Sequence, residues 1–119
     1  MGNAAHEFFH IVTPLTISFK EVKEFNYNNT ILSKHVLFFE GSTEYYSQNV
    51  QACSSVKTPE QFLENLANKI RFSKLYMNYS LSFTEINTKS AGKHKDQYGN
   101  VYMKGAMINA CVDLYLLKL

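Results

Sequence analysis

The motif His6-Glu7-Phe8-Phe9-His10 constrains the fold of this 119-residue chain more than any other stretch. In a helix, two histidines four residues apart lie on the same face, one turn above the other. Two imidazole rings placed in this way can bind one zinc ion and leave positions for a third ligand and a water molecule. Glu7 would then lie close enough to that water to accept its proton. The alternative interpretation is a helix whose histidines merely flank a buried Phe8-Phe9 pair.

The candidate third ligand is Glu40, in the stretch Phe39-Glu40-Gly41-Ser42-Thr43-Glu44-Tyr45-Tyr46. A glutamate within an aromatic-rich helix is expensive to bury unless a positive group meets it, and a zinc ion would do so. Glu44 falls one turn further along the same face, where it can accept the second ring proton of a ligand histidine. If both glutamates lie on a solvent-exposed face instead, they are ordinary surface charges.

Apolar periodicity predicts an all-α domain of about four helices with irregular connections. We interpret residues 1–119 as a single domain, with helices expected over residues 3–13, 33–53, 59–75 and 100–119 and a polar loop over 76–99. Within that loop, Leu81 to Ile86 alternates apolar and polar residues and predicts a short extended piece. Gly41 is the only weak position in the second helix.

Several residues predict where helices begin and end. Thr58, Pro59 and Gln61 are typical of a helix start, as N-cap, first helical residue and capping-box partner. Because Thr13 precedes Pro14, we expect the first helix to end there. The helix expected over 59–75 carries no reactive cluster, and we interpret its role as packing.

Composition excludes some classes of function. The net charge is only +2 and Arg71 is the only arginine, so no basic surface for nucleic acid is expected. The apolar runs are far shorter than a membrane span.

Cys53 and Cys111 form no C-x-x-C pair; we interpret them as buried thiols, or as one disulfide if the protein is exported. His35 and His94 have no second ligand cluster around them and are interpreted as surface or loop residues. The cellular compartment is not predicted.

Three blocks resemble the glycyl aminopeptidase family, which belongs to the gluzincins and is related to aminopeptidase N. They are Ala5 to His10, Phe39 to Tyr46 and Tyr98 to Ala106, in the order of the family. The resemblance implies the helical zinc-binding half of a thermolysin-like catalytic domain. It further implies that His6, His10 and Glu40 bind one zinc ion, that Glu7 is the general base, and that Tyr102 donates a hydrogen bond to the oxyanion.

The motif begins five residues into the chain, whereas such enzymes bring a substrate-binding sheet ahead of this helix. We therefore expect the chain to be a fragment of a larger catalytic domain, inactive by itself and self-associating. Many aromatic residues lie on more than one side of the expected helices, more than one small core can bury. They are Phe8, Phe9, Phe38, Phe39, Tyr45 and Tyr46.

The sequence thus predicts a zinc metallopeptidase that acts on peptide substrates, near a free amino terminus. Two alternatives stay open. One is a non-catalytic helical interaction module that keeps the motif without metal, and metal analysis separates it. The other is a zinc hydrolase of a non-peptide substrate, and a substrate panel separates that one. Ile11-Val12-Thr13 stands where the family commonly has Trp-Asn and basic residues, so the side-chain preference of the enzyme is not predicted.

Overall fold

The computed structural model describes residues 2–16, 20–24, 28, 32–90 and 92–119, without the side chains of residues 2, 13–16, 21 and 22. Over these residues the chain is all-α and has no strand, so the predicted fold class is confirmed. The elements are α1 (Gly2–Thr16), α2 (Lys20–Lys23), α3 (Val36–Cys53), α4 (Pro59–Tyr76), α5 (Phe83–Lys89), a 3₁₀ turn (Lys95–Gln97) and α6 (Gly99–Leu116). No helix in the described ranges is long and apolar enough to cross a membrane.

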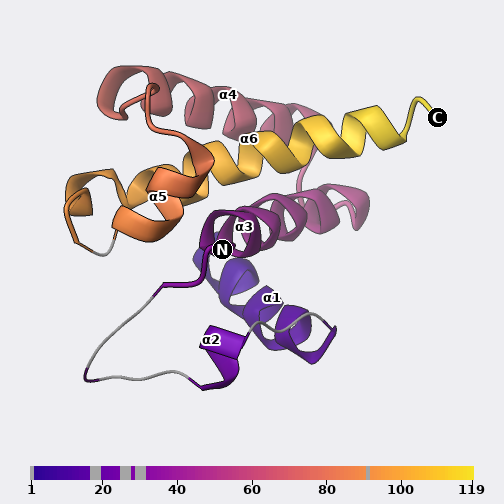
Figure 1. The fold of residues 1–119 in the computed structure, drawn as a ribbon. Helices are drawn as coiled ribbons and strands as arrows, with labels where there is room; N and C mark the ends of the chain where they lie inside the picture. The colour runs from indigo at the N-terminus through magenta and orange to yellow at the C-terminus, as the bar shows by residue number, and fades with distance from the viewer. Residues whose placement is uncertain (1, 17–19, 25–27, 29–31, 91) are drawn as a thin grey trace.

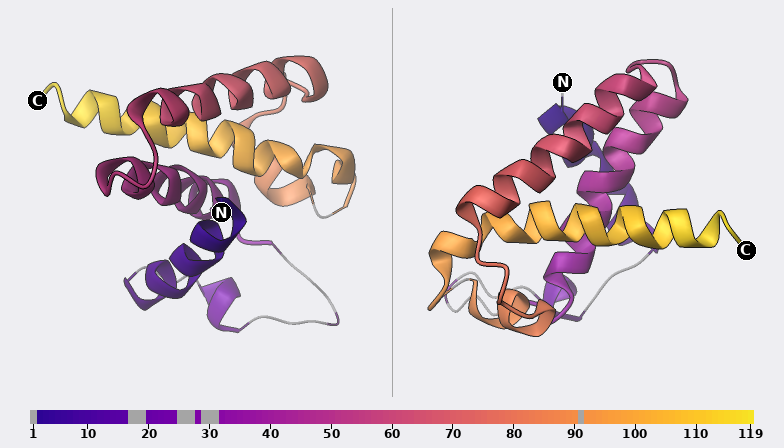
Figure 2. Two further views of the ribbon diagram at one scale, coloured as in Figure 1. Left: turned by 180° about the vertical axis from the view of Figure 1, so that it is seen from behind. Right: turned by 90° about the horizontal axis from the view of Figure 1, so that it is seen from above.

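Helices α3 and α6 form the centre of the molecule. Figure 1 shows the long helices stacked in the order α4, α6, α3 and α1, with α5 beside one end of the central pair. Seen from above, α3 crosses α6 steeply (Figure 2). The C-terminal end of α6 extends beyond the other helices in all of these views. The three blocks that carry the sequence motifs therefore lie on α1, α3 and α6, which meet around α3.

Two glycines allow the central helices to approach each other closely. A Cβ atom at Gly41 of α3 would lie 2.4 Å from the Cα of Gly105 on α6, and a Cβ at Gly105 would lie 2.5 Å from the carbonyl oxygen of Leu37. Both distances are far below van der Waals contact, and the opposing atoms are backbone. Gly41, which reads as a weak helix position in the sequence, is therefore the point at which the two helices touch.

Polar side chains continue this contact along the same two helices. Ser42 Oγ donates a hydrogen bond of 2.8 Å to Asn109 Oδ1, and Tyr45 Oη donates one of 2.7 Å to Asp113 Oδ2. Burial and the hydrogen bond to Asp113 raise the pKa of Tyr45 to about 12. The α3–α6 pair is thus fixed by glycine contact near its middle and by hydrogen bonds further along.

The region predicted as a loop over 76–99 contains a helix, so that prediction is wrong over Phe83–Lys89, as is the extended piece at Leu81 to Ile86. The physical reason lies in Ser82 and Glu85, which form a capping box that starts α5. Asn87 of α5 is fully buried. It accepts a hydrogen bond of 2.7 Å from the backbone N–H of Leu37 at the start of α3. Asn87 also donates to the carbonyl of Lys34.

The small apolar core lies where α3, α5 and α6 meet. Its buried members are Val36, Leu37, Leu81, Ile86 and Val101. The capping box at Thr58 and Gln61 that the sequence predicts is present at the start of α4. The core therefore anchors the beginning of α3, directly before the residues predicted to bind metal.

Two further sequence predictions are wrong in detail. Helix α1 continues through Pro14 to Thr16. A proline disfavours continuation of a helix, and only two residues follow Pro14 in α1, so the helix ends within one turn of the predicted position. Cys53 and Cys111 are free and exposed, not buried. Cys53 is the last residue of α3 and Cys111 lies on the outer side of α6, where neither side chain reaches the core.

We predict that Gly41→Ala destabilises the fold. In an isolated helix this substitution stabilises by about 0.5–1 kcal/mol, because glycine loses more backbone entropy than alanine. Here the added methyl group would meet the backbone of Gly105, and overpacking of this kind costs about 1–3 kcal/mol. Chemical denaturation should therefore show a lower free energy of unfolding. Gly92→Ala is the matched control, since a Cβ there meets nothing within 4 Å. A higher free energy of unfolding for Gly41→Ala would contradict the close approach of α3 and α6 at this position.

We also predict a pH dependence from Tyr45. Its pKa is raised from 10.0 to about 12 in the folded chain, so the stability it contributes is present below about pH 10 and is lost as pH rises toward 12. At pH 8, Tyr45→Phe should lower the free energy of unfolding by about 1–2 kcal/mol. That difference should shrink between pH 10 and 12. Tyr79→Phe, at an exposed position, is the control. A difference that stays constant over this pH range would refute the assignment.

Candidate metal centre

The two histidines of the motif face α3 from one side of α1. His6 is buried, and its Nε2 lies 3.0 Å from Nε2 of His10. The ring of His10 stacks on Phe39 of α3, with centroids 5.4 Å apart and an interplanar angle of 26°. Helix periodicity and this stacking together hold both Nε2 atoms toward the same point.

Glu40 completes the group from α3. Its Oε2 lies 3.4 Å from His6 Nε2 and 3.2 Å from His10 Nε2. The three ligand atoms all lie within 4.8 Å of one another, and this is the one such group of three among the described residues. The three residues that the family resemblance names as zinc ligands are therefore brought together.

The hydrogen-bonding state of this group fits a cation. Glu40 Oε2 is buried and has no hydrogen-bond partner among the described residues, although two imidazole nitrogens are close. His6 Nδ1 lies 2.7 Å from Glu44 Oε2, so a His6 ring with its single proton on Nδ1 would present a lone pair at Nε2. A cation between the Nε2 atoms and the carboxylate would satisfy all three groups at once. The donor set of two imidazoles and one carboxylate is one that zinc prefers.

Glu44 takes the place that its spacing predicts, one turn after Glu40 on the same face of α3. Its second oxygen, Oε1, lies 2.5 Å from Nζ of Lys69 on α4. Both oxygens of the carboxylate are thus engaged, one with a histidine of α1 and one with a lysine of α4. Glu44 is therefore held in one orientation behind the candidate metal ligands.

A cavity of about 410 Å³ opens beside this group. Its lining comes from α1, α3, α4 and α6: Asn3, His6, Glu7, Glu44, Lys69, Tyr102 and Met103. Glu7 is exposed and lines the cavity together with His6, whereas His10 and Glu40 are not among its lining residues. A molecule in the cavity would meet the carboxylate of Glu7 and the ring of Tyr102 at the same time.

Tyr102 is half-buried on α6, and its ring centroid lies 5.7 Å from that of His6. Burial, the nearby charge of Glu40 and a hydrogen bond with Tyr98 raise the pKa of Tyr102 well above its usual value near 10. The charge of Glu7 acts in the same direction. The phenol is therefore neutral near pH 7 and can donate a hydrogen bond. Of the two tyrosines in this block, Tyr102 lines the cavity, and Tyr98 packs edge-on against it at 5.8 Å.

Lys69 is the residue of this site that sequence reasoning missed. The helix that carries it reads as a packing element, yet Lys69 is only 8% exposed and its amine reaches the cavity wall. The signal was present in the spacing. Phe62, Leu66, Lys69 and Ser73 recur at the intervals of one helix face, and Lys69 and Ser73 are buried on α4.

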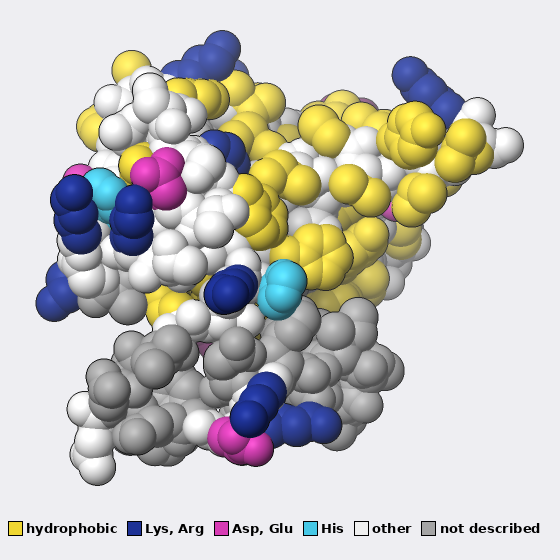
Figure 3. Space-filling model, viewed as in Figure 1, with side chains coloured by type: hydrophobic (Ala, Val, Ile, Leu, Met, Phe, Trp, Pro, Cys, Tyr) yellow, Lys and Arg dark blue, Asp and Glu magenta, His cyan; other side chains and the backbone are white. Residues whose placement is uncertain are grey.

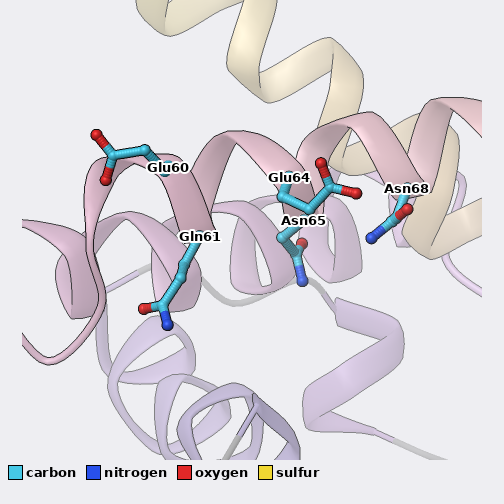
Figure 4. Close-up of a pocket in the computed structure, with 5 residues that line it drawn as sticks. All are labelled: Glu60, Gln61, Glu64, Asn65 and Asn68. Carbon is cyan, nitrogen blue, oxygen red and sulfur yellow. The ribbon is translucent and has the colours of Figure 1, made fainter.

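A second hollow runs along α4 and carries no comparable arrangement (Figure 4). Its lining residues are Glu60, Gln61, Glu64, Asn65 and Asn68, all from one helix. Figure 4 shows their side chains spread along the helix instead of converging on one point. His35 and His94 lie outside the candidate metal-binding group, at the residues that precede α3 and the 3₁₀ turn.

Comparison with known families agrees with this geometry. The family model of the M61 glycyl aminopeptidases matches residues 1–116, a range that includes all three sequence blocks. No curated protein and no solved structure gives a significant match to the chain. Because the match covers nearly the whole chain, it assigns a family of peptidases. The chain belongs to the M61 glycyl aminopeptidase family.

Proposed function

We propose that this chain is the zinc-binding part of a gluzincin metallopeptidase that hydrolyses peptide bonds next to a free amino terminus. The observation that carries the proposal is the convergence of His6, His10 and Glu40, with an unpartnered carboxylate oxygen facing two imidazole nitrogens. The peptidase family of the chain supports the reaction class. These three residues would hold one zinc ion, which when bound lowers the pKa of a water molecule and polarises the scissile carbonyl.

The other residues of the cavity have roles that follow from their chemistry. Glu7 is an exposed carboxylate at the cavity wall, so it can accept the proton of the attacking water and pass it to the leaving amine. Tyr102 stays neutral, so it can donate a hydrogen bond to the oxyanion that forms on the substrate carbonyl. Glu44 orients His6 through Nδ1.

The first test of the proposal is metal binding. The natural protein that contains this chain should bind one zinc ion per chain at this site. His10→Ala should remove most of that zinc, because two ligands rarely hold a zinc ion in a protein site. His94→Ala is the matched control, since His94 lies outside the group of ligands. Elemental analysis after dialysis measures the zinc content. A protein without zinc would point to the non-catalytic module, and a His10→Ala variant that keeps its zinc would contradict this binding site.

The second test concerns the general base. Glu7→Gln should retain zinc and lower kcat by about 10²–10⁴-fold, because an amide cannot accept the proton of the water. Glu24→Gln, at an exposed position whose carboxylate pairs with Lys20, is the control and should keep the activity of the wild type. Steady-state kinetics on an aminoacyl substrate gives kcat. Turnover near that of the wild type at full zinc content would mean that another group is the base.

We further propose that this chain by itself self-associates through the exposed end of α6. Large apolar side chains there are mostly solvent-exposed, from 57% for Leu116 to 87% for Leu119. They continue a groove of about 460 Å³ lined by residues such as Ile108 and Tyr115. Figure 3 shows yellow apolar side chains gathered along this end of the molecule. A contiguous apolar surface of this kind favours association, because contact with another surface removes it from water.

Light scattering coupled to size exclusion tests this proposal on the 119-residue chain. Leu114→Glu and Leu117→Glu together should shift the chain toward monomer. Leu63→Glu is the matched control, because Leu63 is as exposed as Leu114 but lies on α4. A wild-type chain that remains a monomer at about 100 µM would rule out the association.

A further inference from the structure

A buried lysine lies behind the candidate metal centre on a helix that contributes no ligand. Lys69 of α4 is 8% exposed, and its Nζ lies 2.5 Å from Oε1 of Glu44. The other oxygen of Glu44 lies 2.7 Å from Nδ1 of His6. Contacts therefore run without interruption from α4 through α3 to a ligand histidine on α1.

The charges explain why a lysine lies there. The Glu44 side chain is only 15% exposed, and a buried carboxylate that faced a neutral imidazole alone would be an uncompensated charge. Lys69 is the cation that the structure pairs with it, because His6 is the only other ion-pair partner of Glu44 within the described part of the chain. Removing either Lys69 or Glu44 would leave the charge of the other buried without a partner, which is destabilising.

The two contacts of Glu44 also fix the orientation of its carboxylate and of the His6 ring. Because each oxygen of Glu44 has its own partner, the carboxylate plane cannot rotate without breaking one of the two contacts. The oxygen on His6 Nδ1 accepts the hydrogen bond of that nitrogen, and the ring orientation that this contact fixes points Nε2 toward His10 and Glu40. Lys69 thereby acts on His6 through three intervening atoms of Glu44, which are Oε1, Cδ and Oε2.

We propose that Lys69 is a positioning residue of the metal centre, and that its ammonium group holds the Glu44 carboxylate against His6. The proposal rests on the proposed zinc site. It assigns to α4 a function beyond packing, because this helix carries the lysine that orients Glu44 and, through Glu44, the ligand His6. Lys69 does not bind the metal, and it reaches His6 only through Glu44.

The test is a double-substitution cycle on zinc affinity in the natural protein, measured by competition with a chromophoric chelator. Lys69→Met should weaken zinc binding by about 10–100-fold, the usual effect of losing a partner behind a metal ligand. With Glu44→Gln already present, the same substitution should change the affinity by no more than about twofold, the scatter expected of independent sites. Equal losses in both backgrounds would overturn the proposal.

Further readouts separate positioning from simple stability. With Co²⁺ in place of zinc, the visible absorption band should change in Lys69→Met, since His6 loses its fixed orientation, whereas a purely structural role would leave the band unaltered. Lys74→Met, at an exposed position on the same helix, is the matched control and should keep the wild-type affinity. An unchanged zinc affinity with a raised KM would assign Lys69 to substrate binding and overturn the proposal.

If Lys69→Met does not fold, Lys69→Gln serves in its place, because the amide can still donate to Glu44 without the charge. Zinc binding should then weaken as in Lys69→Met, and unchanged binding would overturn the proposal.

Failure of the proposed function is distinguishable from failure of this inference. In the first case the wild-type protein binds no zinc, or binds it independently of His10; in the second, His10-dependent zinc binding persists and only the Lys69 effects are missing.

Discussion

The contact between Gly41 and Gly105 determines where the candidate functional residues of this chain can lie. A Cβ on either residue would come within about 2.5 Å of the opposite helix backbone, as expected where two helix axes pass as closely as their main chains allow. Glu40 directly precedes Gly41, and Tyr102 lies three residues before Gly105, one turn away. The same close crossing thus sets the separation between the candidate third ligand on α3 and the candidate oxyanion donor on α6. A wider crossing would draw Tyr102 away from His6 without altering either helix.

Around this crossing, polar contacts replace much of the apolar core that a domain of this size normally has. The buried apolar cluster is small and lies at the start of α3. Further along, Ser42 pairs with Asn109 and Tyr45 with Asp113 between the central helices. Hydrogen bonds between partly buried side chains specify register more strictly than apolar contacts do, because a donor or acceptor left without its partner is costly. The face of α3 that carries Glu40 and Glu44 is therefore fixed in rotation as well as in position.

Local sequence signals predicted those parts of the fold that depend on one helix at a time. The spacing of His6 and His10, and of Glu40 and Glu44, requires only the helix period, and the structure brings all four side chains together. The capping box of α4 was equally local. Ser82 and Glu85 carried the same signal for α5, but the polar residues around them were interpreted as a loop.

Features that depend on two distant helices could not be predicted in this way. Within its own helix Gly41 is an unfavourable residue. Its role in the close approach of α3 and α6 depends on Gly105, which lies opposite it on another helix. Lys69 lies at the spacing of the buried face of α4, yet a lysine there reads as solvated until a buried carboxylate is known to face it. The cavity that combines Glu7 with Tyr102 needs the placement of α1 on α3 and of α3 on α6 at the same time.

The placement of α1 would link metal binding to folding if the proposed zinc site is occupied. Phe8 and Ile11 on the outer side of this helix are more than 60% exposed, so apolar burial holds α1 to the domain only weakly. On its inner side, His6 and His10 place their Nε2 atoms within 3.4 Å of Glu40 Oε2. A cation bound by these three residues would hold α1 to α3 through three ligand bonds. Part of the free energy of metal binding would then go into ordering α1. Docking of this helix and occupation of the site would be one coupled equilibrium, in which Glu44 and Lys69 hold the α3 side in place.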